Sequence, residues 1–170
     1  MRTLVFAISL VFAITACSEA QKIEGGQDTA GPMPILGANE TILTCFMDYH
    51  DAEARRANCI GQYTEVCTSI SQNQSTHGMT QCASRETQAW TRQLEEVSAL
   101  IVNDLDENPT LAFETTQNAW EAHREAHCRF EISIFEGGTI SSVIYASCFT
   151  QITAERALEL IEWRDAYQSY

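Results

Sequence analysis

The sequence predicts an all-α protein: a small, disulfide-stapled helical bundle of about four helices, in which the last two helices form a hairpin. Apolar residues recur at three- and four-residue spacing through four segments, and no stretch shows the sustained alternation of a half-buried strand. The chain also has seven cysteines in 170 residues. This content indicates an oxidising compartment and a disulfide framework.

The first residues predict export. Arg2 and the amino terminus supply positive charge, and an apolar run broken only by Ser9 follows over residues 4–14. A membrane-spanning helix needs roughly 20 apolar residues. The run is therefore too short to span a membrane, and its place at the extreme terminus argues against a buried helix. Residues 1–16 are predicted to be a signal peptide.

The residues that end this segment predict a lipid anchor. Ile14-Thr15-Ala16-Cys17 resembles the bacterial lipobox, in which the cysteine is acylated and becomes the new N-terminus. Setting Cys17 aside also leaves an even number of cysteines, whereas ordinary secretion would leave one free thiol. With Ser18 rather than aspartate after the cysteine, we expect the periplasmic side of the cell envelope, at the outer membrane if the organism is Gram-negative.

Residues 17–38 are predicted to be a flexible tether. They contain four glycines and two prolines and little apolar material, so they cannot bury enough surface to offset the entropy of ordering. Residues 39–170 then form one domain, which is long enough to bury a hydrophobic core.

Four segments of this domain carry the helical period. The first follows a candidate N-cap at Asn39 and fades near Gly61; the second covers about residues 79–105. The third covers about 110–136, after Pro109, and the fourth follows Thr139, which is placed to cap it. The periodic positions are Ile42, Cys45, Phe46, Tyr49 and Ala52; Trp90, Leu94, Val97 and Ile101; Trp120, His123, His127, Phe130 and Ile134; and Ile144, Cys148, Ile152, Leu158 and Ile161. The polar residues 69–78 are predicted to be a surface loop.

The turn between the last two segments predicts a disulfide. Gly137 and Gly138 stand where a helix C-terminus favours a left-handed residue. Cys128 and Cys148 lie about ten residues on either side of this turn, and equal distances from the turn place residues side by side in an antiparallel helix pair. We therefore expect Cys128 to bond to Cys148.

The remaining four cysteines leave two alternatives. The same argument, centred on the polar loop, pairs Cys67 with Cys82 and leaves Cys45 with Cys59. Fourteen residues of unbroken helix would separate Cys45 from Cys59 by about 21 Å. Either the first helix breaks between them, or the four cysteines pair crosswise. The spacing does not favour a zinc site, because no CxxC pair is present.

The chain is strongly acidic. Its formal net charge is −13, and cleavage before Cys17 would remove Arg2 and bring the mature chain to −14. An acidic surface repels nucleic acid and anionic lipid headgroups, so neither is expected to bind it. A basic partner is favoured if the charge does more than maintain solubility.

Two residue pairs of the third segment have the spacing of chemical sites. His123 and His127 share a helical face, but Arg124 stands where the metalloprotease pattern requires glutamate, and no third ligand is in register. We interpret these histidines as part of a packing face. Glu121 and Glu125 have the spacing of an acid–base pair but are predicted to face solvent. Nucleophile elbows and nucleotide-binding loops are missing from the sequence, so we expect no enzyme, metal or cofactor.

The last two segments carry a recognisable motif. Its residues are Ala119-Trp120, Arg124-Glu125, Cys128, Gly137-Gly138-Thr139, Cys148 and Thr153-Ala154-Glu155-Arg156. With MTQCASRETQAW upstream, this motif resembles the lysozyme inhibitor LprI-like family over about residues 67–162. The sequence departs from the family at His123, where an aromatic residue is usual.

The resemblance implies an exported helical domain, in some members a lipoprotein, with lysozyme inhibition as its activity. We interpret Trp120 and Arg124 as structural, and we expect Arg124 to pair with Glu155 across the hairpin. The leading hypothesis is a lipoprotein that occludes the cleft of a basic lysozyme through a loop or helix end bearing carboxylates. The alternative is a non-catalytic structural or assembly lipoprotein of the bacterial cell envelope.

Overall fold

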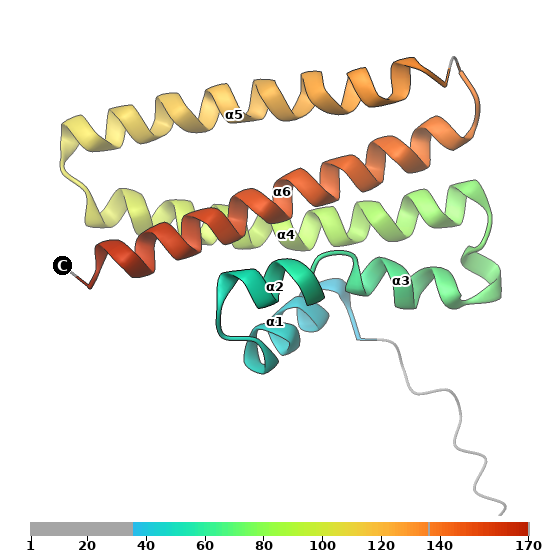
Figure 1. Cartoon of the computed structure of the whole chain (residues 1–170), viewed down its shortest axis with the longest axis horizontal. Coiled ribbons are helices and arrows are strands. Elements are labelled where there is room, and N and C mark those ends of the chain that lie inside the picture. The colour runs from blue at the N-terminus through green and yellow to red at the C-terminus, as the bar shows by residue number, and fades with distance from the viewer. Residues whose placement is uncertain (1–35, 136, 170) are drawn as a thin grey trace, which may run out of the picture. The chain divides into compact units, whose positions relative to one another are not determined.

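The computed structural model describes residues 36–135 and 137–169. The predicted signal peptide, Cys17 and the tether up to residue 35 lie outside these residues. The described part of the chain is helical and contains no strand, which confirms the all-α prediction. Its helices are α1 (Ala38–Asp48), α2 (Ala52–Asn58), α3 (Gln62–Ser69), the 3-10 turn η1 (Ser71–Asn73), α4 (Thr76–Asp104), α5 (Glu107–Ser133) and α6 (Ile140–Tyr167) (Figure 1). This part of the chain therefore has six α-helices rather than about four.

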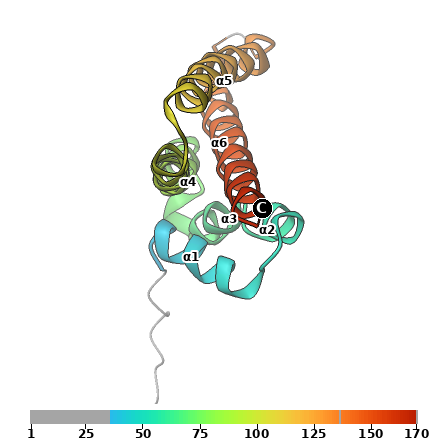
Figure 2. The ribbon, with the colours of Figure 1, turned by 90° about the vertical axis from the view of Figure 1, so that its left-hand side faces the viewer.

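Helices α4 and α6 form the centre of the bundle. They pack along one another, while the short helices α1, α2 and α3 lie on one side of this pair and α5 lies on the other side of α6 (Figure 2). The last two helices are thus a hairpin, as predicted. None of the described helices combines the length and apolarity that crossing a membrane requires.

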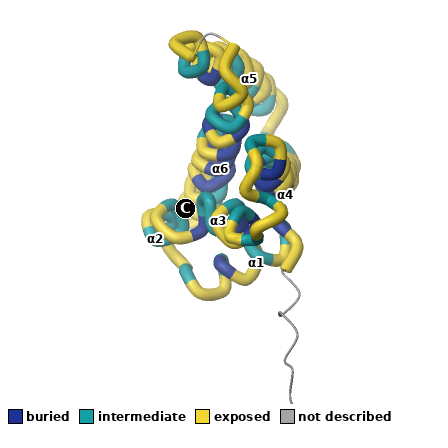
Figure 3. The backbone as a smooth tube through the Cα atoms, turned by 90° about the vertical axis from the view of Figure 1, so that its right-hand side faces the viewer, coloured by how far each residue is buried: buried dark blue, intermediate teal, exposed yellow. Residues whose placement is uncertain are grey.

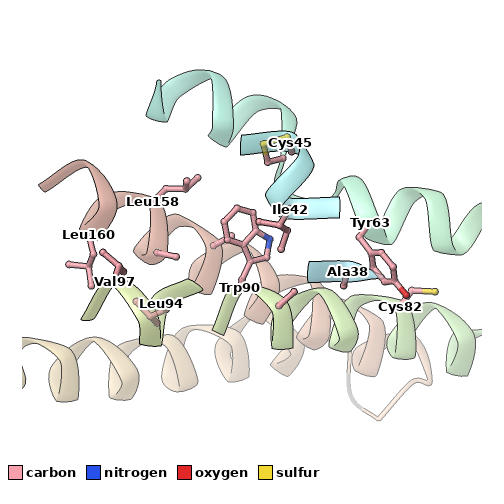
Figure 4. Close-up of a cluster of buried hydrophobic side chains, with 14 of the residues drawn as sticks. Ala38, Ile42, Cys45, Tyr63, Cys82, Trp90, Leu94, Val97, Leu158 and Leu160 are labelled. Atoms are coloured by element: carbon pink, nitrogen blue, oxygen red, sulfur yellow. A yellow bond between two sulfur atoms is a disulfide. The ribbon is translucent and has the colours of Figure 1, made fainter. Parts of the chain in front are cut away.

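The hydrophobic core lies between α1, α3, α4 and α6 (Figure 4). Trp90 of α4 is 0% exposed, and its ring centroid lies 5.7 Å from that of Phe46. The same core contains the buried aliphatic side chains Ile42, Leu94, Val97, Ile101, Leu158 and Leu160. Complete burial of such a side chain stabilises a fold by roughly 1.5–3 kcal/mol. From α5, only the half-buried Phe113 and Trp120 pack against this described core.

The first predicted helix is broken. α1 ends at Asp48, and Asp51 starts α2 by accepting a hydrogen bond from the backbone N–H of Ala54 at 2.8 Å. The break folds the chain back and brings the Cα atoms of Cys45 and Cys59 to 5.7 Å, where they form a disulfide. Of the two alternatives for these cysteines, the structure therefore has the broken helix.

The sequence did not predict α3. Gly61 precedes it with a φ of +86°, a conformation that favours glycine. The first turn of α3 is capped from outside by Glu86 of α4, which is 0% exposed and accepts hydrogen bonds from the backbone N–H groups of Gly61 (2.6 Å) and Thr64 (2.8 Å). A carboxylate at a helix N-terminus satisfies unpaired N–H groups and interacts favourably with the helix dipole.

The predicted surface loop over residues 69–78 is shorter than expected. Ser75 is the N-cap of α4 and accepts a hydrogen bond from the N–H of Gly78 at 3.1 Å, so the helix starts three residues before the predicted Met79. A Cβ at Gly78 would come within 2.6 Å of the Asn73 backbone. The connection between α3 and α4 is therefore tight, and the Cys67–Cys82 disulfide joins these two helices.

The last two helices differ from the prediction at their N-termini, α5 in the residue where it starts and α6 in its capping. α5 starts at Glu107, and Pro109 lies inside its first turn rather than before it. A proline is tolerated there because the first N–H groups of a helix have no partner within the helix. Thr139 is the N-cap residue of α6 as expected, but its side chain makes no capping hydrogen bond. Its backbone is already helical (φ −59°, ψ −22°), whereas a capping side chain needs an extended backbone.

Candidate functional site

The α5–α6 hairpin is closed by a turn and a disulfide. Gly137 has a φ of +76°, the left-handed conformation expected at this turn. Cys128 and Cys148 are bonded, with their Cα atoms 5.7 Å apart, which is the pairing that the hairpin register predicts. Both helices of the hairpin are therefore held in register close to their connection.

Most of α5 is exposed to solvent (Figure 3). Cys128 is the one buried residue among those described in this 27-residue helix. The predicted packing face is therefore wrong beyond Trp120, which is half-buried: His123 and His127 are exposed, Phe130 is 71% exposed and Ile134 is 74% exposed. The spacing of apolar residues identified the apolar face of α5 correctly. No other described helix covers the C-terminal half of that face.

Arg124 holds the middle of α5 to α6. Its guanidinium lies 4.6 Å from the ring centroid of Trp120 and 4.5 Å from that of Phe149, and it donates a hydrogen bond to the Thr153 hydroxyl at 2.9 Å. Partial burial lowers the pKa of Arg124, although neighbouring carboxylates oppose this effect. The predicted pairing with Glu155 is wrong: Glu155 is exposed and accepts a hydrogen bond from Gln151 of its own helix.

Glu125 forms a second link between the two helices. Tyr145 of α6 donates a hydrogen bond to it at 2.7 Å, and Arg129 of α5 forms an ion pair with it. The Tyr145 hydrogen bond is the main reason that the pKa of Glu125 is lowered, with Arg129 next. Burial and the bond to Glu125 raise the pKa of Tyr145. Glu125 is thus held as a structural carboxylate and is not paired with Glu121 as an acid–base couple would be.

The other motif residues are structural or exposed. Arg156 is 8% exposed and donates to Gln117 of α5 at 2.8 and 2.6 Å and to Glu159 at 2.8 Å. Ala119 faces solvent, and Gly138 and Thr139 complete the turn. No sequence pattern indicated the partners of the motif arginines and of Glu125, which are Gln117, Thr153, Tyr145 and Phe149.

A groove runs between α5, α6 and α2 beside the two histidines. It has a volume of about 660 Å³. In it, His127 Nε2 lies 3.3 Å from Glu131 Oε1, and both lie within 4.8 Å of Cys148 Sγ. The Cys148 sulfur is committed to the disulfide and is not a thiolate ligand. His127 and Glu131 alone are fewer than the three or four protein ligands of an ordinary zinc site.

The closed end of the hairpin carries four exposed apolar side chains, which we call the hairpin end. It consists of Phe130, Ile134, Phe135 and Ile140, with exposed fractions of 71%, 74%, 40% and 46%. These residues come from the last turn of α5, the connection and the first residue of α6. Large apolar clusters on a protein surface are typical of interaction sites.

Comparison with known proteins identifies the family of this chain. A family model described as Lysozyme inhibitor LprI matches residues 67–160, more than half of the sequence, including α4, α5 and most of α6. No curated protein and no solved structure matches the chain. The family match and the three disulfides together indicate an extracytoplasmic protein. The chain belongs to the lysozyme inhibitor LprI family.

Proposed function

We propose that this protein binds a basic lysozyme and inhibits it by stoichiometric occlusion of the active-site cleft. The observation that carries this proposal is the family match over residues 67–160, because these residues contain α5, the hairpin turn and α6 up to Leu160. The hairpin projects apolar groups that no described part of the chain covers, as a binding surface must.

The hairpin end is the contact surface that we propose. Phe130 and Phe135 are aromatic, and aromatic side chains are enriched at the centres of protein interfaces. The adjacent Glu131 supplies a carboxylate at the same end of α5. An apolar centre with a charged rim is the usual anatomy of such an interface.

Electrostatic attraction would bring the two proteins together. The chain has a formal net charge of −13, because 23 aspartates and glutamates outnumber 10 lysines and arginines. Four arginines form ion pairs within the fold, and each pair cancels one charge of either sign, so the excess of carboxylates remains: Arg56–Glu162, Arg129–Glu125, Arg156–Glu159 and Arg164–Asp104. A net negative surface steers a basic partner at low ionic strength.

A titration of lysozyme activity tests the proposal. We expect lysis of a cell-wall suspension to stop near equimolar inhibitor, and association to slow between low salt and about 0.15 M, where the Debye length is about 8 Å. An unrelated protein of equal charge is the control. Failure to inhibit several lysozymes at tenfold excess, or equal inhibition by the control, would favour the structural envelope protein instead.

A pair of substitutions locates the contact. Phe130→Ala combined with Ile134→Ala removes two exposed side chains of the hairpin end, and we expect the inhibition constant to rise at least tenfold while Tm stays nearly constant. Leu111→Ala is the matched control, because Leu111 is 56% exposed near the opposite end of α5. Equal losses from the two variants would rule out the hairpin end as the contact.

We also propose that Cys17 carries a lipid anchor that holds the domain at the cell envelope, in the outer membrane of a Gram-negative cell. The six other cysteines pair with one another, which leaves Cys17 as the seventh. Two or more acyl chains anchor a protein stably. Cys17→Ser should therefore move the protein from the membrane fraction to the soluble fraction, and an unmodified N-terminus at another residue, seen by intact mass, would contradict the proposal.

A further inference from the structure

The three disulfides differ in how well the protein shields them from solvent. Each cysteine of the pairs Cys45–Cys59 and Cys67–Cys82 is at most 3% exposed. In the third pair Cys128 is 0% exposed, but Cys148 is 8% exposed and lines the groove between α5, α6 and α2. Exposed disulfides are the ones that exchange with thiols, whereas shielded ones persist. A thiol that enters this groove therefore meets the Cys148 sulfur.

The same groove places a histidine and a carboxylate beside this sulfur. His127, Glu131 and Cys148 each bring one N, O or S atom to within 4.8 Å of the other two. His127 Nε2 lies 3.3 Å from Glu131 Oε1, and both side chains are 42% exposed. A neutral imidazole has one donor and one acceptor nitrogen, so the contact with Glu131 directs Nε2 as the donor and leaves Nδ1 able to take a proton. A base beside a reacting sulfur, itself oriented by a third group, is the arrangement that activates thiols.

The third disulfide also has a different structural role from the other two. Cys45, Cys59, Cys67 and Cys82 belong to the hydrophobic core, whereas Cys128 and Cys148 lie outside it. Cys128 is the one buried residue among those described in α5. Opening this disulfide would therefore loosen α5 and leave the core closed.

We infer that Cys148 is a site of thiol–disulfide exchange with an external dithiol, and that this exchange releases α5 from α6. In the first step His127 takes the proton of the incoming thiol. The resulting thiolate bonds to Cys148 Sγ as the Cys128–Cys148 bond breaks. The Cys128 sulfur leaves as a thiolate and receives the proton from the imidazole, so His127 ends neutral.

The second step completes the reduction. The other thiol group of the dithiol attacks the dithiol's own sulfur in the mixed disulfide, and its proton passes to the departing Cys148 sulfur. The protein disulfide thus gains two electrons and two protons, and the dithiol becomes a disulfide. Exchange at Cys148 is independent of lysozyme inhibition and does not involve the hairpin end.

Timed reduction with dithiothreitol, a small dithiol, tests this inference. The protein would be the full chain with Cys17→Ser, with free thiols blocked by N-ethylmaleimide at each time and located by peptide mass mapping. We expect Cys128–Cys148 to open at least tenfold faster than either of the other disulfides. Hydrogen exchange of the singly reduced protein should accelerate in α5 and not in α4. Similar opening rates for the three disulfides, or equal acceleration in the two helices, would overturn the inference.

A matched pair of variants tests the role of the imidazole. His127→Ala removes the base and should slow the opening of Cys128–Cys148 at least tenfold. His123→Ala is the control, because His123 is exposed one turn earlier on α5 and is not part of the close group around Cys148. Both histidines are exposed, so Tm should stay nearly constant in both variants. Equal rates in the two variants would overturn the assignment of His127 as the base.

Discussion

Helices α4 and α5 have nearly the same length and both pack against α6, but they are held by different forces. The 29-residue α4 buries ten residues, including Trp90, which is 0% exposed. The described residues of the 27-residue α5 include one that is buried, Cys128. A long, mostly apolar buried face therefore fixes α4, whereas α5 depends on a disulfide and a few polar links.

These polar links lie at separate points along α5. They are the hydrogen bonds from Arg124 to Thr153, from Tyr145 to Glu125 and from Arg156 to Gln117, together with the Arg124 stack on Phe149. Because they occupy little of the helix surface, the remainder of α5 stays available for a partner. Helix α4 thus forms part of the hydrophobic core, whereas most of α5 is exposed at the surface.

The largest expected effect is a difference in unfolding free energy between two alanine variants, one of a buried aromatic residue in α4 and one of an exposed aromatic residue in α5. Trp90→Ala should lower the free energy of unfolding by about 3–5 kcal/mol, because it removes a fully buried ring. Phe130→Ala should change it by less than about 0.5 kcal/mol, because Phe130 is 71% exposed. Urea unfolding of both variants is the measurement. A cost of several kcal/mol for Phe130→Ala would show that α5 is not the exposed helix described above.

Removing the Cys128–Cys148 disulfide should have the next largest effect. Its cysteines are 20 residues apart, so replacing both with serine should cost about 3 kcal/mol if the bond acts on the unfolded chain. Hydrogen exchange should then accelerate in α5 well before it does in α4. The Cys45→Ser, Cys59→Ser variant is the control and should leave exchange in α5 unchanged. Equal acceleration in α4 and α5 would contradict the difference in how the two helices are held.

The smallest expected effect is a pH dependence of α5. The pKa of Glu125 is lowered by its bond to Tyr145, so the stability that this carboxylate contributes is present above the ordinary value of 4.5 and is lost as pH falls through the folded-state pKa. The pKa of Tyr145 is raised, so its contribution is present below the ordinary value of 10.0 and is lost as pH rises through the folded-state pKa.

Tyr145→Phe removes this hydrogen bond and keeps the ring. We expect its Tm to be slightly below that of the wild type at neutral pH, and the two Tm values to converge in acid. Melting curves followed by circular dichroism between about pH 7 and pH 3 measure this. A constant difference over that range would show that Glu125 does not contribute to the pH dependence.

Much of the hairpin could be predicted because its signals are local. The glycine pair set the turn, and counting from the turn paired Cys128 with Cys148. The periodic positions of the second segment became the buried face of α4. The same periodicity misled in α5, because a repeat of apolar residues shows which face is apolar and does not show whether another helix covers that face.

The sequence by itself determined the helical class, the Cys128–Cys148 pair and the family, because helical period, turn residues and motif spacing are encoded in neighbouring residues. Only the tertiary structure decided that Arg124 reaches Thr153 rather than Glu155, that α3 forms, and that most of α5 stays exposed. The physical reason is distance along the chain. The cap of α3 comes from Glu86, 25 residues after Gly61, and no local pattern reports a hydrogen bond made across that separation.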